Sequence, residues 1–267
     1  MIAICMIREL PHYRRDAFVN GLKRAGYSIV DKGRPADKRD VLVIWNRYGP
    51  FEAMANRWEE QGGSVLVAEN GYIGRDANDH QLYALAVHGH NGSGWWPRGD
   101  GGRFAALGID VAPWVNRPEG YALICGQRGI GSREMASPPN WHDKVAQSWA
   151  GPVKIRRHPG NKPDPNAPKL VDDLAGAKCC VVWSSSSGVR ALTLGIPVFF
   201  DAPHWICEDA AVPVRRPDDF EMPSPELLED LRTVALERMA WAQWSIAELE
   251  TGDPFARILD GIGEATW

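Results

Sequence analysis

Four consecutive serines, Ser184, Ser185, Ser186 and Ser187, follow an apolar segment and precede Gly188. An apolar stretch suited to a helix begins directly behind them, so we expect the hydroxyls at a helix N-terminus. That end of a helix carries unpaired N–H groups and a partial positive charge. Together with hydroxyls and a glycine it suits an anion, most often phosphate. The alternative is an ordinary serine cap. The run matches neither a Walker loop nor the GxGxxG or GxSxG motifs.

Basic and polar side chains follow two other apolar segments. Arg156, Arg157 and His158 end one segment, and Gln127 and Arg128 follow another. Arginine can form charged forks with phosphate, and a histidine at a strand end can donate a hydrogen bond. We therefore expect these groups to bind the same ligand as the serines, with a purely structural histidine as the alternative.

A carboxylate stands at the end of a third apolar segment. Glu69 directly follows residues 64–68 and precedes Asn70 and Gly71. At a strand end it could accept a proton from an attacking hydroxyl as a general base. The alternative is that Glu69 forms an ion pair with Arg47 or Arg75.

Tryptophans lie in a Gly- and Pro-rich stretch over residues 88–120. Trp95 and Trp96 could stack on sugars or bases there, or they could fix a long loop onto the domain. We expect a second, acceptor-side group of residues in this part of the chain. Its members are Arg47, Asn70, Gly71, Arg75, Trp95 and Trp96.

The elements that must position these residues alternate in type. Strands are predicted at residues 1–7, 40–46, 64–71, 121–127, 153–160, 179–184 and 196–202, with helices at 13–26, 50–63, 140–151, 170–178 and 188–195. Strand–helix alternation predicts parallel sheets with right-handed crossovers. Ligands of such sheets bind beyond the C-terminal ends of the strands, where the polar residues above fall.

The order of elements predicts two successive α/β units and a helical tail. We expect a Rossmann-like acceptor-side domain over residues 1–118 and a Rossmann-like nucleotide-sugar-binding domain over 119–235. Helices over 236–267 would complete the chain and could cross back to the first domain.

The composition excludes several classes of protein. The chain has 267 residues, 44% hydrophobic and 24% charged, with a net charge of −4. No apolar stretch approaches the roughly 20 residues that span a bilayer, and a cytoplasmic location is expected. The five cysteines are expected to be buried and reduced. His88 and His90 lack a third ligand nearby and no DxD motif is present, so no metal and no cofactor are predicted.

The ordered motifs carry a family resemblance. ENG at 69–71, HP at 158–159 and the serine run resemble the acidic-Gly, HP and SS motifs of GT-B glycosyltransferases that use CMP-activated sugars, such as bacterial sialyl- and polysialyltransferases. The wider frame, with VIWNR, AENGYIGR, GQRG, RRHPG and SSSSGVRALTLGIPVFF, is similar to capsule-polysaccharide Kdo transferases. The resemblance runs from about Val41 to Asp201. Asn70 replaces a second acidic residue, and no aspartate follows the Gly-Gln motif.

The resemblance implies a GT-B-like fold and roles for particular residues. Glu69 would activate the acceptor, and His158 with Ser184 to Ser187 would hold the donor phosphate. The expected function is a metal-independent glycosyltransferase with a nucleotide-sugar as co-substrate and a glycan as acceptor.

Two alternatives stay open. The tail from Ala240 resembles small phage-encoded glycosyltransferases, some of which modify DNA, so hydroxymethylated DNA is a second possible acceptor. Its phosphates would meet Arg14, Arg15, Lys23, Arg24, Arg98 and Arg103. The other alternative is a non-catalytic nucleotide- or glycan-binding module.

Overall fold

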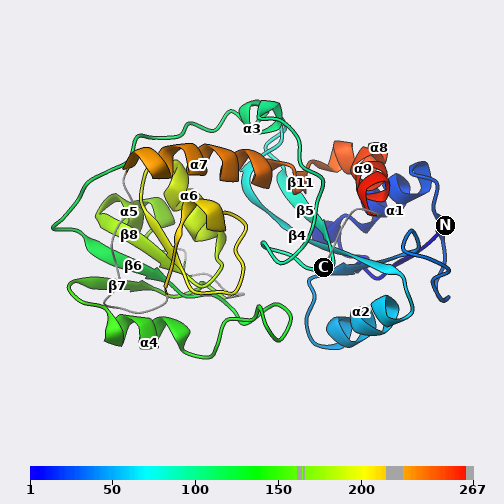
Figure 1. The fold of residues 1–267 in the computed structure, drawn as a ribbon, viewed down its shortest axis with the longest axis horizontal. Coiled ribbons are helices and arrows are strands. Elements are labelled where there is room, and N and C mark those ends of the chain that lie inside the picture. The colour runs from blue at the N-terminus through cyan, green and yellow to red at the C-terminus, as the bar shows by residue number, and fades with distance from the viewer. Residues whose placement is uncertain (161–163, 165, 215–224, 263–267) are drawn as a thin grey trace. The chain divides into compact units, whose positions relative to one another are not determined.

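The computed structural model describes residues 1–160, 164, 166–214 and 225–262 (Figure 1). The chain forms two compact units. The first unit comprises Met1–Leu107, Gly131–Arg133 and Glu237–Trp267, and the second comprises Gly108–Ile130 and Glu134–Leu236. Residues 215–224 of the domain expected over 119–235, and residues 263–267 of the helices expected over 236–267, lie outside the described residues.

A single sheet runs through the described part of the first unit. Its strands are β1 (Ile2–Cys5), β2 (Ser28–Ile29), β3 (Val41–Trp45), β4 (Ser64–Arg75), β5 (Gln81–Val87) and β11 (Gln243–Trp244), in the order β11-β5-β4-β3-β1-β2. The pairs β2–β1, β1–β3 and β3–β4 are parallel, whereas β5 pairs antiparallel with both β4 and β11. Strands β1, β3 and β4 agree with the expected alternation; β2, β5 and β11 were not predicted.

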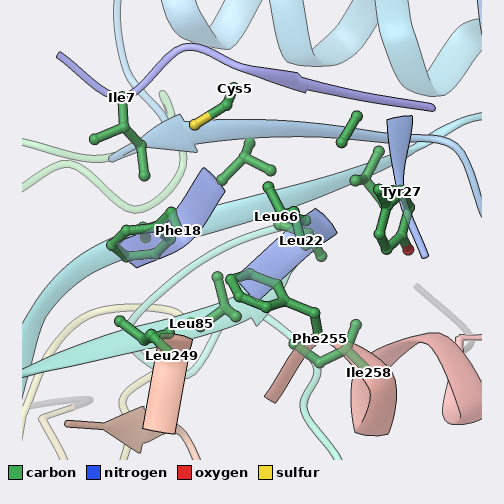
Figure 2. Packing of buried hydrophobic residues seen from close by; sticks show 14 of the residues in the cluster. Cys5, Ile7, Phe18, Leu22, Tyr27, Leu66, Leu85, Leu249, Phe255 and Ile258 are labelled. Carbon is green, nitrogen blue, oxygen red and sulfur yellow. The ribbon is translucent and has the colours of Figure 1, made fainter. Parts of the chain in front are cut away.

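Helices cover both faces of this sheet. They are α1 (Arg15–Arg24), α2 (Pro50–Glu60), α8 (Ile246–Thr251) and α9 (Asp253–Gly261). The unit also contains a short helix without buried residues, α3 (Gly102–Ala106), and a 3₁₀ turn at Pro11–Tyr13. Successive strand residues face opposite sides, so Leu66 and Ala68 of β4 pack with α1, α8 and α9, while Val65 and Val67 pack with α2. Figure 2 shows the first of these cores, where Phe255 and Leu249 lie beside Phe18 and Leu22 of α1.

The second unit contains a wholly parallel sheet among the described residues. Its strands are β6 (Tyr121–Cys125), β7 (Val153–Arg156), β8 (Ala177–Val182), β9 (Val198–Phe200) and β10 (Val212–Pro213), in the order β10-β9-β8-β6-β7. The helices are α4 (Trp141–Ser148), α5 (Leu170–Ala175) and α6 (Ser186–Thr193), with a 3₁₀ turn at Glu208–Ala210. The predicted α/β class with two parallel-strand sheets is confirmed.

The tail is helical with one interruption. Helix α7 (Pro225–Ala240) begins in the second unit and ends in the first, and α8 and α9 follow. The helical tail predicted from the sequence included residues 241–245, but Gln243–Trp244 form β11 at the sheet edge, where Leu85 N–H donates to the Ala242 carbonyl. None of the described helices has the length and apolarity that crossing a membrane requires.

Both sheets reverse their strand order at one point. In the first unit β1 lies between β2 and β3, and in the second β6 lies between β7 and β8. Ligands of open α/β sheets bind beyond the C-terminal ends of the strands at such a reversal. The residues after β1 and β3, and after β6 and β8, are therefore the places in which to look for ligand groups. All five cysteines are buried free thiols, as expected.

Candidate functional site

The serine run forms the turn from β8 into α6. Ser185 is the N-cap of α6, and its Oγ accepts a hydrogen bond from the Ser187 backbone N–H at 3.2 Å. The Ser185 hydroxyl also lies 3.1 Å from Ser187 Oγ. Ser186 begins the helix with an exposed side chain, whereas Ser184 is buried. Capping thus explains one serine, and the exposed hydroxyl and helix N-terminus beside it suit an anion.

Gln127 joins the serine turn to the neighbouring strand. Its Oε1 accepts from Ser184 N–H at 3.0 Å, and its Nε2 donates to Ser184 Oγ at 3.1 Å. Gln127 follows β6 and Ser184 follows β8, so this reciprocal pair spans the point where the strand order reverses. The pair fixes both turns at the expected binding position. No sequence pattern announces it, because the two residues are far apart in the chain.

Gly188 is required by packing. A Cβ on Gly188 would lie 2.7 Å from the Trp205 ring, which is fully buried behind α6. The glycine thus lets the first turn of α6 approach Trp205 closely. Gly188 therefore has a packing role, and its expected contact with a ligand stays a prediction.

The end of β7 carries two arginines with different surroundings. Arg156 forms an ion pair with the buried carboxylate of Asp173. Arg157 is 65% exposed and contacts helix α4, with Nη2 2.8 Å from Asp143 Oδ1 and Nη1 2.6 Å from His142 Nε2. Arg156 therefore supports the sheet, and Arg157 is the arginine that solvent and ligands can reach.

His158 is oriented by its own turn. Its Nδ1 accepts a hydrogen bond from Gly160 N–H at 2.9 Å, so the neutral ring carries its proton on Nε2. Burial, and secondarily the positive charge of Arg128, lower the pKa of His158 below its ordinary value of 6.5. Near neutral pH the ring therefore offers an Nε2–H donor from the same edge of the sheet as the serines. Arg128 itself is exposed after β6.

Glu69 lies at the end of the parallel part of β4. Ala68 pairs with Trp45 at the end of β3, and Glu69 pairs with Ala84 of the antiparallel strand β5. The sequence predicted that Glu69 leaves the strand, but β4 continues to Arg75 because β5 supplies a new partner. The carboxylate is half-buried, and its Oε1 accepts from the Tyr72 hydroxyl at 2.5 Å.

Arg47 belongs to a buried ionic network. Its side chain is bidentate to Glu59, at 2.9 and 2.6 Å, and donates to Asn56 Oδ1 at 2.6 Å. Although burial opposes it, hydrogen bonds from His88 and Arg47 hold the pKa of Glu59 below its ordinary value. The alternative pairing of Glu69 with Arg47 is therefore wrong, and the 6% exposed Arg47 is not placed to contact an acceptor.

Three further acceptor-side candidates lie on the β4–β5 hairpin. Asn70 is exposed and accepts from Gln81 Nε2, and Arg75 lies 3.5 Å from Asp79 at the hairpin tip, so it does not pair with Glu69. A Cβ on Gly71 would lie 2.8 Å from Leu82, so the glycine lets the two strands approach. The side chains of Asn70 and Arg75 are exposed to solvent.

The two tryptophans fix the long loop onto the first unit. Trp96 is 7% exposed, and its indole N–H donates to the Arg238 carbonyl at 3.0 Å. Trp95 bridges to Val87, and a Cβ on Gly261 would lie 2.5 Å from its ring. Burial leaves Trp96 little surface for stacking, whereas Trp95 is half-buried and its stacking role stays a prediction.

Several of the arginines considered for DNA phosphates already contact protein groups. Arg103 binds Glu248 at 2.6 Å and stacks over Trp244 at 3.9 Å. Arg14 lies 3.2 Å from Asp16, and Arg15 lies 3.2 Å from Glu9. No cluster of three potential metal-ligating side chains occurs within the residues that the structure describes.

Comparisons with known proteins support the fold. No protein-family model and no curated protein matches the chain. A solved structure described as Thermosulfurimonas dismutans KpsC, beta Kdo 2,7 transferase, matches with a TM-score of 0.52 and 13% identity, covering 94% of this chain and 97% of that one. The beta Kdo 2,4 transferase of the same KpsC matches with a TM-score of 0.50 and 14% identity, covering 90% and 89%. The chain thus has the GT-B-like fold of these glycosyltransferases.

Proposed function

We propose that the chain is a glycosyltransferase that moves a sugar from a nucleotide-sugar to a hydroxyl acceptor. The observation that carries the proposal is that several hydrogen-bond donors suited to an anion follow the C-terminal ends of strands in the sheet of the second unit. The exposed start of α6 with Ser186, the Nε2–H of His158 and the exposed Arg157 all follow strands of that sheet. Their charges and N–H groups favour a phosphate ester.

In the proposed reaction the acceptor hydroxyl attacks the anomeric carbon of the donor sugar. The bond between this carbon and the phosphate oxygen breaks as the new bond forms. The released phosphate gains negative charge, which His158 and the N-terminal N–H groups of α6 would stabilise. Glu69 would take the proton of the acceptor hydroxyl. Arg128 would add positive charge beside His158. This assignment uses no metal, since arginine and helix N–H groups supply the positive field.

A panel of nucleotides and turnover assays test the proposal. Thermal shift with CMP, UDP and GDP should reveal the donor base, since a ligand at a hundred times its Kd adds about 2.7 kcal/mol of stability. Because the structural neighbours are described as Kdo transferases, a nucleotide-activated Kdo belongs in the panel beside neutral nucleotide-sugars.

Turnover separates an enzyme from a binding module. Release of nucleotide from a nucleotide-sugar that binds, with or without an added glycan, would support the transferase. Tight binding with no nucleotide release under any condition would favour the non-catalytic module. No binding of any nucleotide or nucleotide-sugar would reject both the transferase and a nucleotide-binding module.

A further inference from the structure

The phenol of Tyr72 contacts Glu69, the carboxylate that is the general base in the proposed function. The Tyr72 hydroxyl donates to Glu69 Oε1 at 2.5 Å, three residues further along β4. A hydrogen bond from a phenol to a carboxylate is short and strong, and it fixes the rotamer of the carboxylate. Tyr72 therefore has the chemistry to hold Glu69 in one position.

The Tyr72 hydroxyl is itself fixed from its other side. It accepts the backbone N–H of Asn91 at 3.0 Å. Asn91 lies in a turn with a left-handed backbone at φ 53°, and Ser93 closes this turn by bonding the His90 carbonyl at 2.8 Å. A hydroxyl that accepts one backbone N–H directs its own proton elsewhere, here onto Glu69. The His-Gly-His-Asn segment at residues 88–91 thus orients the phenol.

The backbone of Tyr72 is pinned by a buried amide from the far end of the chain. Gln243 of β11 is 1% exposed. Its Oε1 accepts from Tyr72 N–H at 2.8 Å and Ile73 N–H at 3.2 Å, and its Nε2 donates to the Ile73 carbonyl at 2.6 Å. These backbone groups fall where the β4–β5 register shifts between Asn70 and Arg75, so the ladder does not satisfy them. The amide replaces the missing ladder and holds the bulge in shape.

We propose that Tyr72 and Gln243 are positioning residues for Glu69. Gln243 fixes the backbone of the bulge, the bulge carries the phenol, and the phenol holds the carboxylate in the orientation that accepts a proton. Neither residue touches substrate in this assignment. The inference rests on the proposed role of Glu69 as the base, although the contact itself can be tested without activity.

The direct test is ¹³C NMR of the full chain labelled at tyrosine Cζ. The chain has six tyrosines, and Tyr72→Phe identifies the resonance of Tyr72. A phenol that donates to a carboxylate has a Cζ shift different from one that donates to an amide or water. Glu69→Gln should therefore move the Tyr72 resonance and leave the other tyrosines in place. An unmoved Tyr72 resonance would overturn the inference.

The functional test is the steady-state kinetics of Tyr72→Phe with the donor that the nucleotide panel identifies. We expect kcat to fall about tenfold with the donor KM within about twofold, since one charge-assisted hydrogen bond is lost. Tyr83→Phe is the matched control, because that buried phenol of the adjacent strand donates to the His12 carbonyl instead. Gln243→Glu keeps the acceptor oxygen but loses the donor to Ile73, and should reproduce the kcat loss.

The outcomes separate the inference from the function on which it rests. Equal kcat values for Tyr72→Phe and Tyr83→Phe would reject the positioning role even if the Cζ shift moves. If Gln243→Glu does not fold, Tyr72→Phe alone decides. A wild-type chain that turns over no donor would reject the proposed function, whereas the Cζ experiment would still show whether Tyr72 holds Glu69.

Discussion

Ser185 and Ser186 are adjacent, yet the structure predicts opposite consequences for replacing them with alanine. Ser185 caps α6 through the Ser187 N–H, whereas Ser186 is exposed at the first helical position. Loss of an N-cap typically costs about 1 kcal/mol of stability. Loss of an exposed serine at a helix start costs little, within about 0.5 kcal/mol. Ser185→Ala should therefore lower the free energy of unfolding, and Ser186→Ala should not.

The effect on phosphate binding should follow the other order. A hydrogen bond to a charged group contributes about 1.5–3 kcal/mol, so Ser186→Ala should weaken nucleotide binding roughly 10- to 150-fold if its hydroxyl meets the phosphate. Ser185→Ala should weaken binding through the shape of the turn, together with its stability loss. Calorimetric titration with the bound nucleotide and urea unfolding of each variant measure the two quantities separately.

A clear result would refute this reasoning. If Ser186→Ala binds nucleotide as well as the wild type while unfolding at the same urea concentration, the exposed hydroxyl is not a phosphate ligand. The serine run would then be a helix cap whose other serines have structural roles, as Ser184 has through its hydrogen bonds with Gln127. Thr251→Ala in α8 is a suitable control, because it removes an exposed helical hydroxyl in the first unit.

Three further predictions concern the groups around the proposed reaction. Glu69→Gln should lower kcat by about 10²–10⁴-fold with donor affinity nearly intact, and Glu60→Gln, an exposed carboxylate of α2, should change neither in the same assay. The lowered pKa of His158 leaves the ring neutral in the free protein at pH 7, whereas a bound phosphate ester favours the protonated ring. Nucleotide-sugar affinity should therefore rise as pH falls from 7 through the folded-state pKa, by at most about tenfold per pH unit. His158→Gln should flatten this dependence. The same lowered pKa removes stability as pH falls through the same window, because the unfolded chain takes up the proton more readily. Turnover should persist in excess EDTA; loss of turnover that Mg²⁺ or Mn²⁺ restores would assign the charge stabilisation to a metal.

The sequence predicted the parts of the fold that depend on local pattern. Alternating apolar runs and amphipathic stretches were sufficient for the longer parallel strands, for α6 behind the serines, and for the position of Glu69 at the end of the parallel ladder. Strands β2, β10 and β11 were missed because each has only two residues and is defined by its pairing partner; β11, for example, pairs with Ala84 and Tyr83, far away in the chain. Strand β5 was also missed, because its antiparallel pairing with β4 does not follow the strand–helix alternation.

Site residues were harder to predict because residue type does not reveal existing partners. The sequence gives no sign that Arg47 has a partner, but Glu59 of the following helix α2 forms an ion pair with it. Trp96 lies in a polar stretch, yet the carbonyl of Arg238 satisfies its indole N–H. Gln127 and Tyr72 acquire their significance only from Ser184 and Glu69, through contacts that no spacing rule contains.

The first unit is assembled from segments that precede and follow the second unit in the sequence, and this sets an order for its synthesis. Phe18 and Leu22 are made before the second unit, but Leu249, Phe255 and Ile258, which cover them, are made after it. Helix α1 fits so closely against α8 that a Cβ on Gly21 would lie 1.9 Å from the Leu249 carbonyl. The second unit, almost contiguous in sequence, can bury its own core while the first still exposes apolar surface. Translation therefore leaves residues 1–107 dependent on a segment made after the second unit, and a ribosome that stops before α8 releases a chain with an open hydrophobic face that chaperones and proteases recognise.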